Sequence, residues 1–257
     1  MTTLTPPLGR TAATRIFIER SLTHSRRDTE SLIMAVALPA ILMVMFTYVF
    51  GGAIDPTGSY VNYVVPGTIL LAAGFGAAST AVSVSRDMTE GFMDRLRTMA
   101  VPRATVITGH VIASLARNLL ATAVVVGVAL ALGFRPTAGP AEWVAAAGLV
   151  ALYIAAITYL FAAIGIVARS PEAASGYGFF LLFLPYLSSA FVPVATMPTA
   201  LRWFAEHQPI TPITETLRAL LVGGDGQPLL ALAWCLVLLG TGVAWSTWLF
   251  ARRGRRA

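Results

Sequence analysis

Long apolar runs separated by short polar segments set the pattern of this chain. The runs cover residues 32–50, 64–84, 111–132, 144–168, 176–191 and 229–250. A helix needs about 20 mostly apolar residues to cross the hydrocarbon core of a bilayer. The pattern therefore predicts six transmembrane helices, and Pro185 is expected to kink the short fifth one.

Composition supports the same fold class. Hydrophobic residues make up 56% of the 257 residues and charged residues only 12%, whereas soluble domains carry about 25% charged residues. We predict an all-α integral membrane protein with one transmembrane domain over residues 1–257. Its parts are a polar N-terminus (1–31), a six-helix body (32–250) and a basic tail (251–257).

A polar island at residues 87–103 separates the second and third apolar runs. Asp87 and Glu90 have the spacing of a capping box, and Pro102 is expected to end the helix that follows. The apolar residues of this helix fall on one face, at Phe92, Met93, Leu96 and Met99. Such a helix lies flat on a membrane or docks into a partner's groove. For the island as a whole, the alternative is a charged loop. For Glu90, the alternative is a role as a helix cap only.

Two further polar segments carry a helical pattern. Residues 11–24 alternate apolar and charged side chains, which predicts a helix in the membrane interface, the alternative being a frayed tail. Five prolines interrupt residues 192–228, and two short helices fit between them, at Thr199–His207 and Pro212–Val222. The second should stop at Gly223-Gly224.

The arginines predict the orientation. The chain has 18 arginines and no lysine. Fourteen of them fall in the N-terminus, the island, Arg169 and the tail, which all lie on one side if six helices cross. The other side receives Arg135, Arg202 and Arg218. Because cytoplasmic loops are rich in basic residues, both termini and the island should be cytoplasmic, and residues 192–228 should face outward.

Several chemistries are absent from the sequence. Without lysine the chain has no P-loop, so it is not an ATPase of that type. A single cysteine, Cys235, excludes an internal disulfide, and the three histidines show no metal-ligand spacing. The six predicted crossings contain no Asp or Glu, which argues against an intramembrane enzyme. The arginine pattern reflects topology and does not suggest a nucleic-acid partner.

Two groups of residues carry a resemblance. The island holds Glu90-Gly91, Asp94-Arg95-Leu96-Arg97 and Val101-Pro102-Arg103, with Gly109 entering the next helix. It resembles the cytoplasmic loop of type 2 ABC exporter permeases, although Met99-Ala100 stands where a Leu-Pro or Met-Pro step is common. The outer connection is similar to that of the daunorubicin-resistance subgroup. Its matching residues are Phe191-Val192-Pro193, Met197-Pro198, the run 202–209, Thr211-Pro212 and Leu217-Arg218.

The resemblance implies a function and a set of partners. It implies a subunit of an exporter in a bacterial cell membrane that moves a hydrophobic or amphipathic compound outward. The partners would be a separate ATP-binding subunit, which holds ATP and magnesium, and a second permease copy. The alternative is a membrane scaffold or receptor that recruits a partner without transport. The implied coupling residues are Glu90, Gly91, Phe92, Asp94, Arg95, Leu96, Arg97 and Pro102.

The resemblance also implies a substrate path between two copies, lined by the first, second and fifth helices. Its aromatic candidates are Phe46, Phe75, Phe179, Phe183 and Tyr186. Each has an alternative role in packing or against lipid. The two short outer helices would form an extracellular gate that includes Pro193, Pro198, Trp203, Phe204 and Arg218.

A few other residues are open to more than one interpretation. Arg117 would lie about 9 Å into the membrane. Its side chain either snorkels to the headgroups or pairs with an acid such as Glu90 or Asp94, and a substrate role is a third alternative. Asn118 is expected to bond between helices. Tyr60 is expected to anchor the outer interface, as are Trp143 and Trp203.

Overall fold

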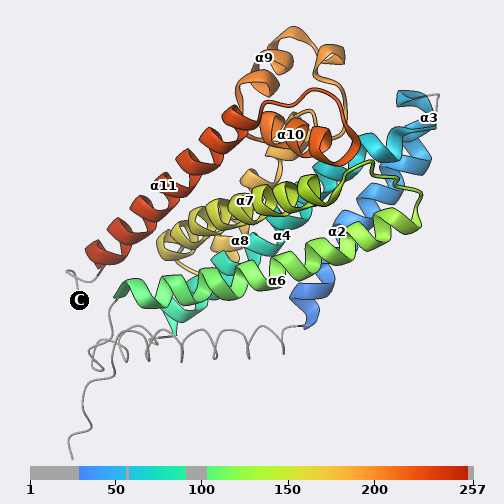
Figure 1. The fold of residues 1–257 in the computed structure, drawn as a ribbon. Coiled ribbons are helices and arrows are strands. Elements are labelled where there is room, and N and C mark those ends of the chain that lie inside the picture. Colours follow the sequence, from blue (N-terminus) through green and yellow to red (C-terminus); the bar gives the residue numbers. More distant parts are fainter. Residues whose placement is uncertain (1–28, 56–57, 91–102, 254–257) are drawn as a thin grey trace, which may run out of the picture.

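The computed structural model describes residues 29–55, 58–90 and 103–253 (Figure 1). Its α-helices are α2 (Thr29–Met45), α3 (Gly51–Ile54), α4 (Tyr60–Thr89), α6 (Arg103–Ala131), α7 (Pro140–Val167), α8 (Pro171–Leu182), α9 (Thr199–His207), α10 (Ile210–Val222) and α11 (Pro228–Arg253). A π-helical turn (Phe46–Phe50) joins α2 to α3, and 3₁₀ turns lie at Leu184–Leu187 and Val194–Thr196. The described chain contains no β-strand, so the prediction of an all-α protein is confirmed.

Five helical segments in the described ranges are long and apolar enough to cross a membrane. They are Ala35–Ile54, Tyr60–Thr89, Val111–Ala131, Pro140–Val167 and Pro228–Phe250. Each coincides with a predicted crossing, and the two short helices appear as α9 and α10. Helix α9 has the predicted bounds, whereas α10 begins two residues early, at Ile210.

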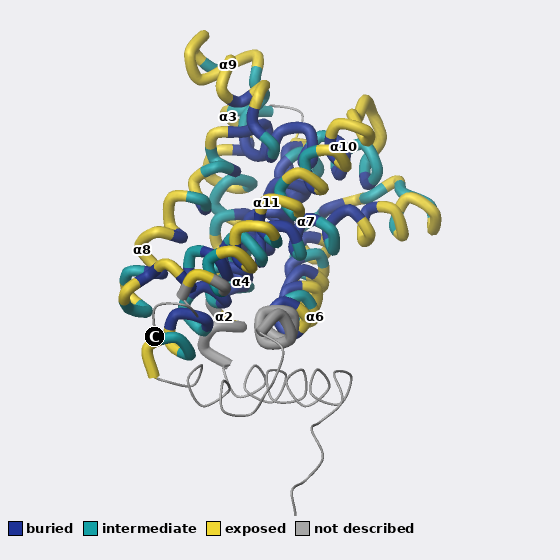
Figure 2. The backbone as a smooth tube through the Cα atoms, turned by 90° about the vertical axis from the view of Figure 1, so that its left-hand side faces the viewer, coloured by how far each residue is buried: buried dark blue, intermediate teal, exposed yellow. Residues whose placement is uncertain are grey.

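Helix α4 lies at the centre of the body. It contacts α7, α6, α2 and α8, and Figure 2 shows its backbone largely in the colour of buried residues. In its most apolar stretch 72% of the residues are buried, against 17% for Ala35–Ile54 and 22% for α11. The first and last spans therefore present most of their apolar surface outward.

Glycines set how closely α4 approaches its neighbours. A Cβ atom added at Gly165 of α7 would lie 2.4 Å from the carbonyl oxygen of Ala81. A Cβ atom at Gly67 of α4 would lie 2.7 Å from the Cα atom of Ala190. No side chain fits at such distances, so these contacts bring backbone against backbone, as small residues do in membrane helix pairs.

The predicted fifth crossing differs from the observed element. The sequence pattern predicted a helix over residues 176–191, but α8 begins at Pro171 and ends at Leu182. The hydroxyl of Ser170 caps its start by accepting from the Ala173 amide at 3.2 Å. Pro185 explains the early end, because in a continued helix its ring would clash with the carbonyl of residue 181.

The segment from α8 to Phe191 nevertheless follows α4 along most of its length. Leu182 contacts the position of Gly74, Ala190 contacts Gly67, and the Phe191 carbonyl accepts from Tyr60. Near the start of α8, the charge of Glu172 interacts with that of Arg86. Between Arg86 and Tyr60 a helix rises about 39 Å, more than the ~30 Å thickness of the hydrocarbon core. The segment is thus long enough for a sixth crossing, which stays a prediction.

Candidate transport path and coupling surface

Six aromatic rings form a continuous series between α8 and the π-helical turn; we call it the aromatic ladder. Its neighbouring rings are Phe179–Phe183 (centroids 4.8 Å apart), Phe183–Tyr186 (6.0 Å), Tyr186–Phe191 (5.1 Å), Phe191–Phe46 (4.5 Å) and Phe46–Phe50 (5.6 Å). Aromatic pairs at these distances attract one another beyond their buried area.

The rings at both ends of the ladder are exposed, and a ring in its middle is buried. Phe179 is 56% exposed, Phe191 2% and Phe50 43%. Four of its members, Phe46, Phe179, Phe183 and Tyr186, were predicted as path residues, and the structure brings them together. Phe75 of α4 packs against the buried core instead, outside the ladder.

The buried middle of the ladder coincides with the non-helical stretch that follows α8. Backbone outside a helix needs other hydrogen-bond partners, and in a membrane it is tolerated where protein surrounds it. Here the Tyr60 hydroxyl donates to the Phe191 carbonyl at 2.5 Å, and the Tyr63 hydroxyl donates to the Ser189 carbonyl at 2.9 Å. On the other side, Thr211 of α10 accepts from the Ser189 amide at 3.3 Å. These side chains replace the helical bonds that the break removes.

Arg218 of α10 completes this arrangement. Its guanidinium donates to the Ser189 carbonyl at 2.7 Å and to the Tyr63 carbonyl at 3.2 Å, and it lies 3.8 Å from the centroid of the Tyr63 ring. Burial lowers the pKa of Arg218, but arginine remains charged in proteins. We call Tyr60, Tyr63, Ser189, Thr211 and Arg218 the polar junction.

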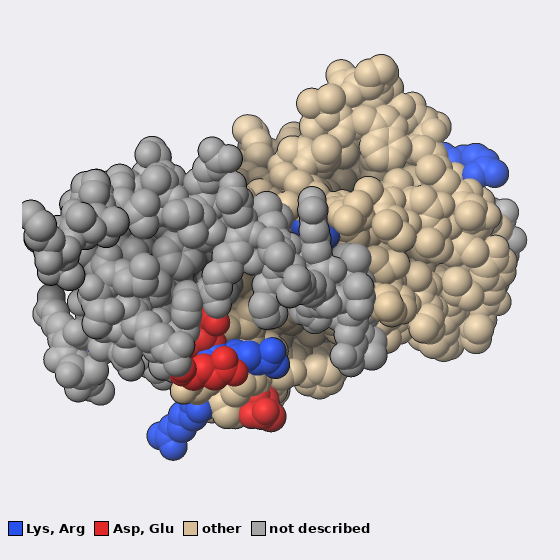
Figure 3. Space-filling view, turned by 90° about the horizontal axis from the view of Figure 1, so that it is seen from below, with Lys and Arg blue, Asp and Glu red and all other residues tan. Residues whose placement is uncertain are grey.

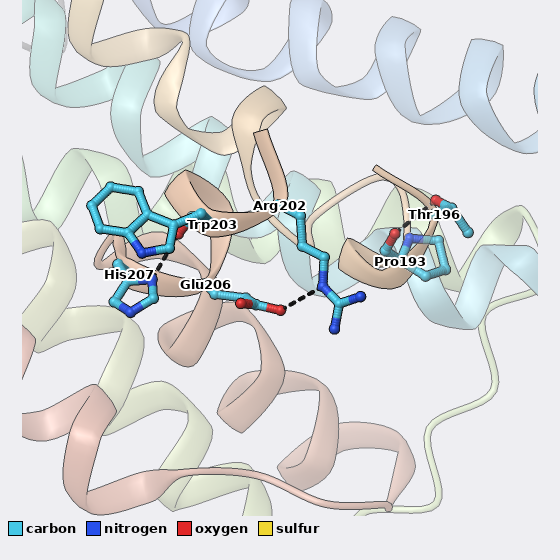
Figure 4. A network of polar contacts seen from close by, with 6 residues as sticks. All are labelled: Pro193, Thr196, Arg202, Trp203, Glu206 and His207. Carbon is cyan, nitrogen blue, oxygen red and sulfur yellow. Dashed lines mark hydrogen bonds and ion pairs between the residues drawn. The ribbon is translucent and has the colours of Figure 1, made fainter. Parts of the chain in front are cut away.

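Helix α9 is largely exposed (Figure 2). Arg202 and Glu206 form an ion pair at 2.8 Å (Figure 4). The Trp203 ring stacks on His207 with centroids 4.7 Å apart, and Trp203 is 64% exposed. Pro193 accepts from the amide and hydroxyl of Thr196, which closes the turn before α9. Pro198 caps α9, and Phe204 lies partly exposed on it.

A second polar group joins α4 to α6. The Thr80 hydroxyl donates to the Ser114 hydroxyl at 2.8 Å, and Arg117 donates to the Ser79 hydroxyl at 2.7 Å. Asn118 is buried, donates to Ser114 on its own helix, and faces Gly76 of α4. The hydrogen bond shown for Asn118 is thus within α6, whereas Thr80 and Ser114 link the two helices.

The end of α4 opposite the junction leads into the predicted coupling island and carries the charged residues Arg86, Asp87 and Glu90. Figure 3 shows acidic and basic side chains gathered at this end. A hydrogen bond from Ser170 lowers the pKa of Glu172, and the charge of Arg86 lowers it further. The predicted start of the island helix at Asp87 is wrong: α4 continues to Thr89, because the Glu90 amide bonds to the Arg86 carbonyl at 2.9 Å.

The described residues include only part of the predicted sites. Glu90 lies exposed at the end of α4, whereas Gly91, Phe92, Asp94, Arg95, Leu96, Arg97 and Pro102 lie outside the described residues. The N-terminal interface helix (11–24) and residues 254–257 lie outside them too. The predicted gate residue Arg218 contacts α4 and the stretch after α8, whereas Trp203 and Phe204 lie on the exposed α9.

Sequence reasoning misjudged one residue of the junction and missed others. Tyr60 was predicted to anchor the interface but is 2% exposed and bonds to Phe191. Tyr63, Ser189 and Thr211 were not assigned a site role, nor was Phe191 of the ladder. Two signals were available: Phe191 and Thr211 belong to the outer motif that carries the resemblance, and the spacing of Tyr60 and Tyr63 puts both hydroxyls on one face of α4.

Comparison with known proteins assigns the chain to a family. The family model described as "ABC-2 type transporter" matches residues 12–222. The chain belongs to this family. The ABC-2 type assignment covers α2 to α10, including both the ladder and the junction.

Two curated relatives of this ABC-2 type protein are named for drug resistance. One is the daunorubicin resistance ABC transporter permease protein DrrB1 of Streptomyces coeruleorubidus, 30% identical over 217 residues. That alignment covers 84% of this chain and 77% of the relative. The other is the probable doxorubicin resistance ABC transporter permease protein DrrC of Mycobacterium tuberculosis, 28% identical over 221 residues, covering 83% of this chain and 78% of the relative.

The resemblance to ABC permeases of the daunorubicin-resistance group is thus confirmed. An ABC-2 type protein with several apolar helices is a multi-pass membrane protein, a transmembrane subunit and not the catalytic one. The described residues hold no group of three or more potential metal ligands.

Proposed function

We propose that the chain is the transmembrane subunit of an ATP-driven exporter that moves a hydrophobic or amphipathic compound, such as a drug, an antibiotic or a lipid-like metabolite, out of a bacterial cell. The observation that carries this proposal is the aromatic ladder, whose buried middle lies at the polar junction. A flat apolar molecule would find exposed rings at both ends of the ladder, at Phe179 and at Phe50. The names of the two relatives support the substrate class.

The orientation follows from charge. We place the end of α4 with Arg86 in the cytoplasm, together with both termini, because most arginines belong to that side. The polar junction and α9 would then face outward. Trp203 would anchor α9 at the outer interface, and Pro193 and Pro198 would set the entry to this gate.

The partners follow from the same arrangement. A separate ATP-binding subunit, with ATP and magnesium, would dock on the island, where Phe92 and Leu96 provide apolar anchors and Asp94, Arg95 and Arg97 provide charge. A second permease copy would face α2 and α8. The exposed ladder residues that follow these elements, Phe50 and Phe183, would then line a path between the copies.

The test is ATP-dependent export from inside-out vesicles that contain the permease and its ATP-binding subunit. Phe183→Ala should reduce export at least tenfold by interrupting the ladder. Phe180→Ala is the matched control, because Phe180 is on the same helix and 77% exposed but is not part of the ladder. Equal losses in both variants would show that the ladder is not the path.

A purification experiment tests the partner. The ATP-binding subunit should accompany wild type in mild detergent, and Glu90→Ala combined with Leu96→Asp should release it. If the subunit binds and no export is measured for any aromatic compound, the scaffold alternative gains support. If no subunit accompanies wild type, the transport proposal fails.

A further inference from the structure

We infer that Arg218 is a charge-selecting residue of the path, which weakens the binding of cationic substrates beside the buried middle of the ladder. This inference rests on the proposed function, since it assigns a charge preference to the path described above. It concerns substrates that combine a flat aromatic part with a positive charge.

The first support is that the charge of Arg218 is only partly compensated. Its contacts are two backbone carbonyls and the face of the Tyr63 ring. Among the described residues, the one ion pair is that between Arg202 and Glu206 on α9. Glu215, one turn away on α10, attracts the guanidinium without an ion pair. Carbonyl dipoles and a ring face carry no net charge, and Glu215 offsets the charge only from a distance, so a reduced positive field remains at the guanidinium.

The second support is the place of this charge. Arg218 donates to the carbonyl of Ser189, which is two residues from Phe191, the buried ring of the ladder. Two residues span at most about 7 Å of extended chain, so the guanidinium lies roughly 10 Å from that ring. At this distance and an effective dielectric constant near 20, repulsion between two unit charges weakens binding roughly tenfold.

The third support is the contrast along the ladder. At Phe179 and Phe183 a cation meets exposed ring faces, which attract it. The described acid at the other open end, Asp55, accepts from Ser59 at 2.8 Å and follows the short helix after Phe50. A cation would therefore bind better at the two exposed ends of the ladder than beside Arg218. The charge of Arg218 would act at the middle of the path, where it disfavours cations relative to neutral molecules of the same shape.

The test compares two flat probes of similar size on the permease and ATP-binding subunit in lipid nanodiscs. N-methylacridinium carries a permanent charge, and acridine is neutral at pH 8. Equilibrium dissociation constants are measured by fluorescence for wild type, Arg218→Gln and Arg218→Lys. Because Arg218 also holds the stretch after α8, its replacement is expected to affect both probes, so the result is the ratio of the two dissociation constants. In Arg218→Gln this ratio should shift roughly tenfold in favour of N-methylacridinium, whereas Arg218→Lys keeps the charge and should keep the wild-type ratio.

A second variant makes the surroundings of Arg218 more positive instead of less. Glu215→Gln leaves every hydrogen bond of Arg218 in place and removes the nearby negative charge. It should weaken binding of N-methylacridinium two- to threefold and leave acridine unchanged, and it serves as the test if Arg218→Gln does not fold.

The outcomes separate this inference from the proposed function. Equal shifts for both probes, or an Arg218→Lys variant that behaves like Arg218→Gln, would overturn the role of charge and leave the path intact. If neither probe binds wild type, or if Phe183→Ala does not weaken binding, the path itself is wrong and the inference falls with it.

Discussion

Helix α4 is held in two different ways at its two ends. Near Arg86 it meets α7 backbone to backbone, at Gly165 and Ala81, and meets α6 through small buried hydroxyls. Near Tyr60 it meets a stretch that is not helical. There Gly67 lies against the backbone of Ala190, and long side chains reach from α4 and α10 to the carbonyls on either side of Ala190.

The difference teaches which end is suited to movement. Two helices in backbone contact cannot shift without a steric clash, so they move as one body. Hydrogen bonds between side chains and carbonyls can break and re-form elsewhere at a modest cost in free energy. The backbone contacts near Arg86 suit the transmission of a movement from α7 to α4. The side-chain hydrogen bonds near Tyr60 suit a local opening of the stretch after α8.

The largest expected effect is at the rigid end. Gly165→Ala would place its Cβ atom 2.4 Å from the Ala81 carbonyl oxygen, and should lower the free energy of unfolding by about 2 kcal/mol. Gly148→Ala on the same helix has no atom within 4 Å of its added Cβ and should not destabilise the protein. Unfolding in detergent measures both, and equal stability of the two variants would mean that α4 and α7 are not in such close contact.

The next effect is at the junction. Tyr60→Phe removes the hydroxyl that bonds to the buried Phe191 carbonyl, and should cost about 1–2 kcal/mol of the free energy of unfolding. Tyr63→Phe should cost less, because Arg218 still donates to the Ser189 carbonyl. Both variants should fall below wild type in the same unfolding measurement. The reverse order would mean that Arg218 does not hold the stretch.

A smaller effect is expected where α4 meets Asn118. Gly76→Ala places a methyl group on the Asn118 amide, 1.3 Å from its oxygen. That amide is the end of a side chain that can turn, so we expect a loss of about 1 kcal/mol in the free energy of unfolding. In a double-mutant cycle, adding Asn118→Ala should remove most of this loss. Additive losses would show that the methyl group clashes with something else.

The smallest effect is expected on α9. Arg202→Ala removes an exposed ion pair between residues four apart, which is worth less than about 0.5 kcal/mol of the free energy of unfolding. Added salt should change the free energy of unfolding of the wild-type protein as little as the substitution does. A loss as large as that of Tyr60→Phe would place α9 among the elements that hold the junction together.

The sequence was sufficient for the elements whose ends are marked by local chemistry. Helix α9 was predicted with its observed bounds because Pro198 begins it, and Gly223-Gly224 correctly predicted the end of α10. The long spans followed from hydropathy, which depends only on neighbouring residues.

The errors fall where the deciding contact is distant in the chain or where two local signals compete. The Tyr60 hydroxyl bonds to a carbonyl 131 residues away, so its amphipathic character alone suggested an interface anchor. Pro185 shortened α8 more than its apolar pattern indicated. At Asp87 the capping pattern competed with the continuation of α4, and continuation won.

The polar junction has a consequence for how a protein of this type evolves. Tyr60, Tyr63 and Arg218 hold the stretch after α8 by the carbonyls of Ser189 and Phe191, and every residue type has the same carbonyl. The frame therefore does not depend on which side chains stand there. Substitutions can change the side chains that this stretch presents while its backbone stays in place, so its surface can diverge without a change in the fold.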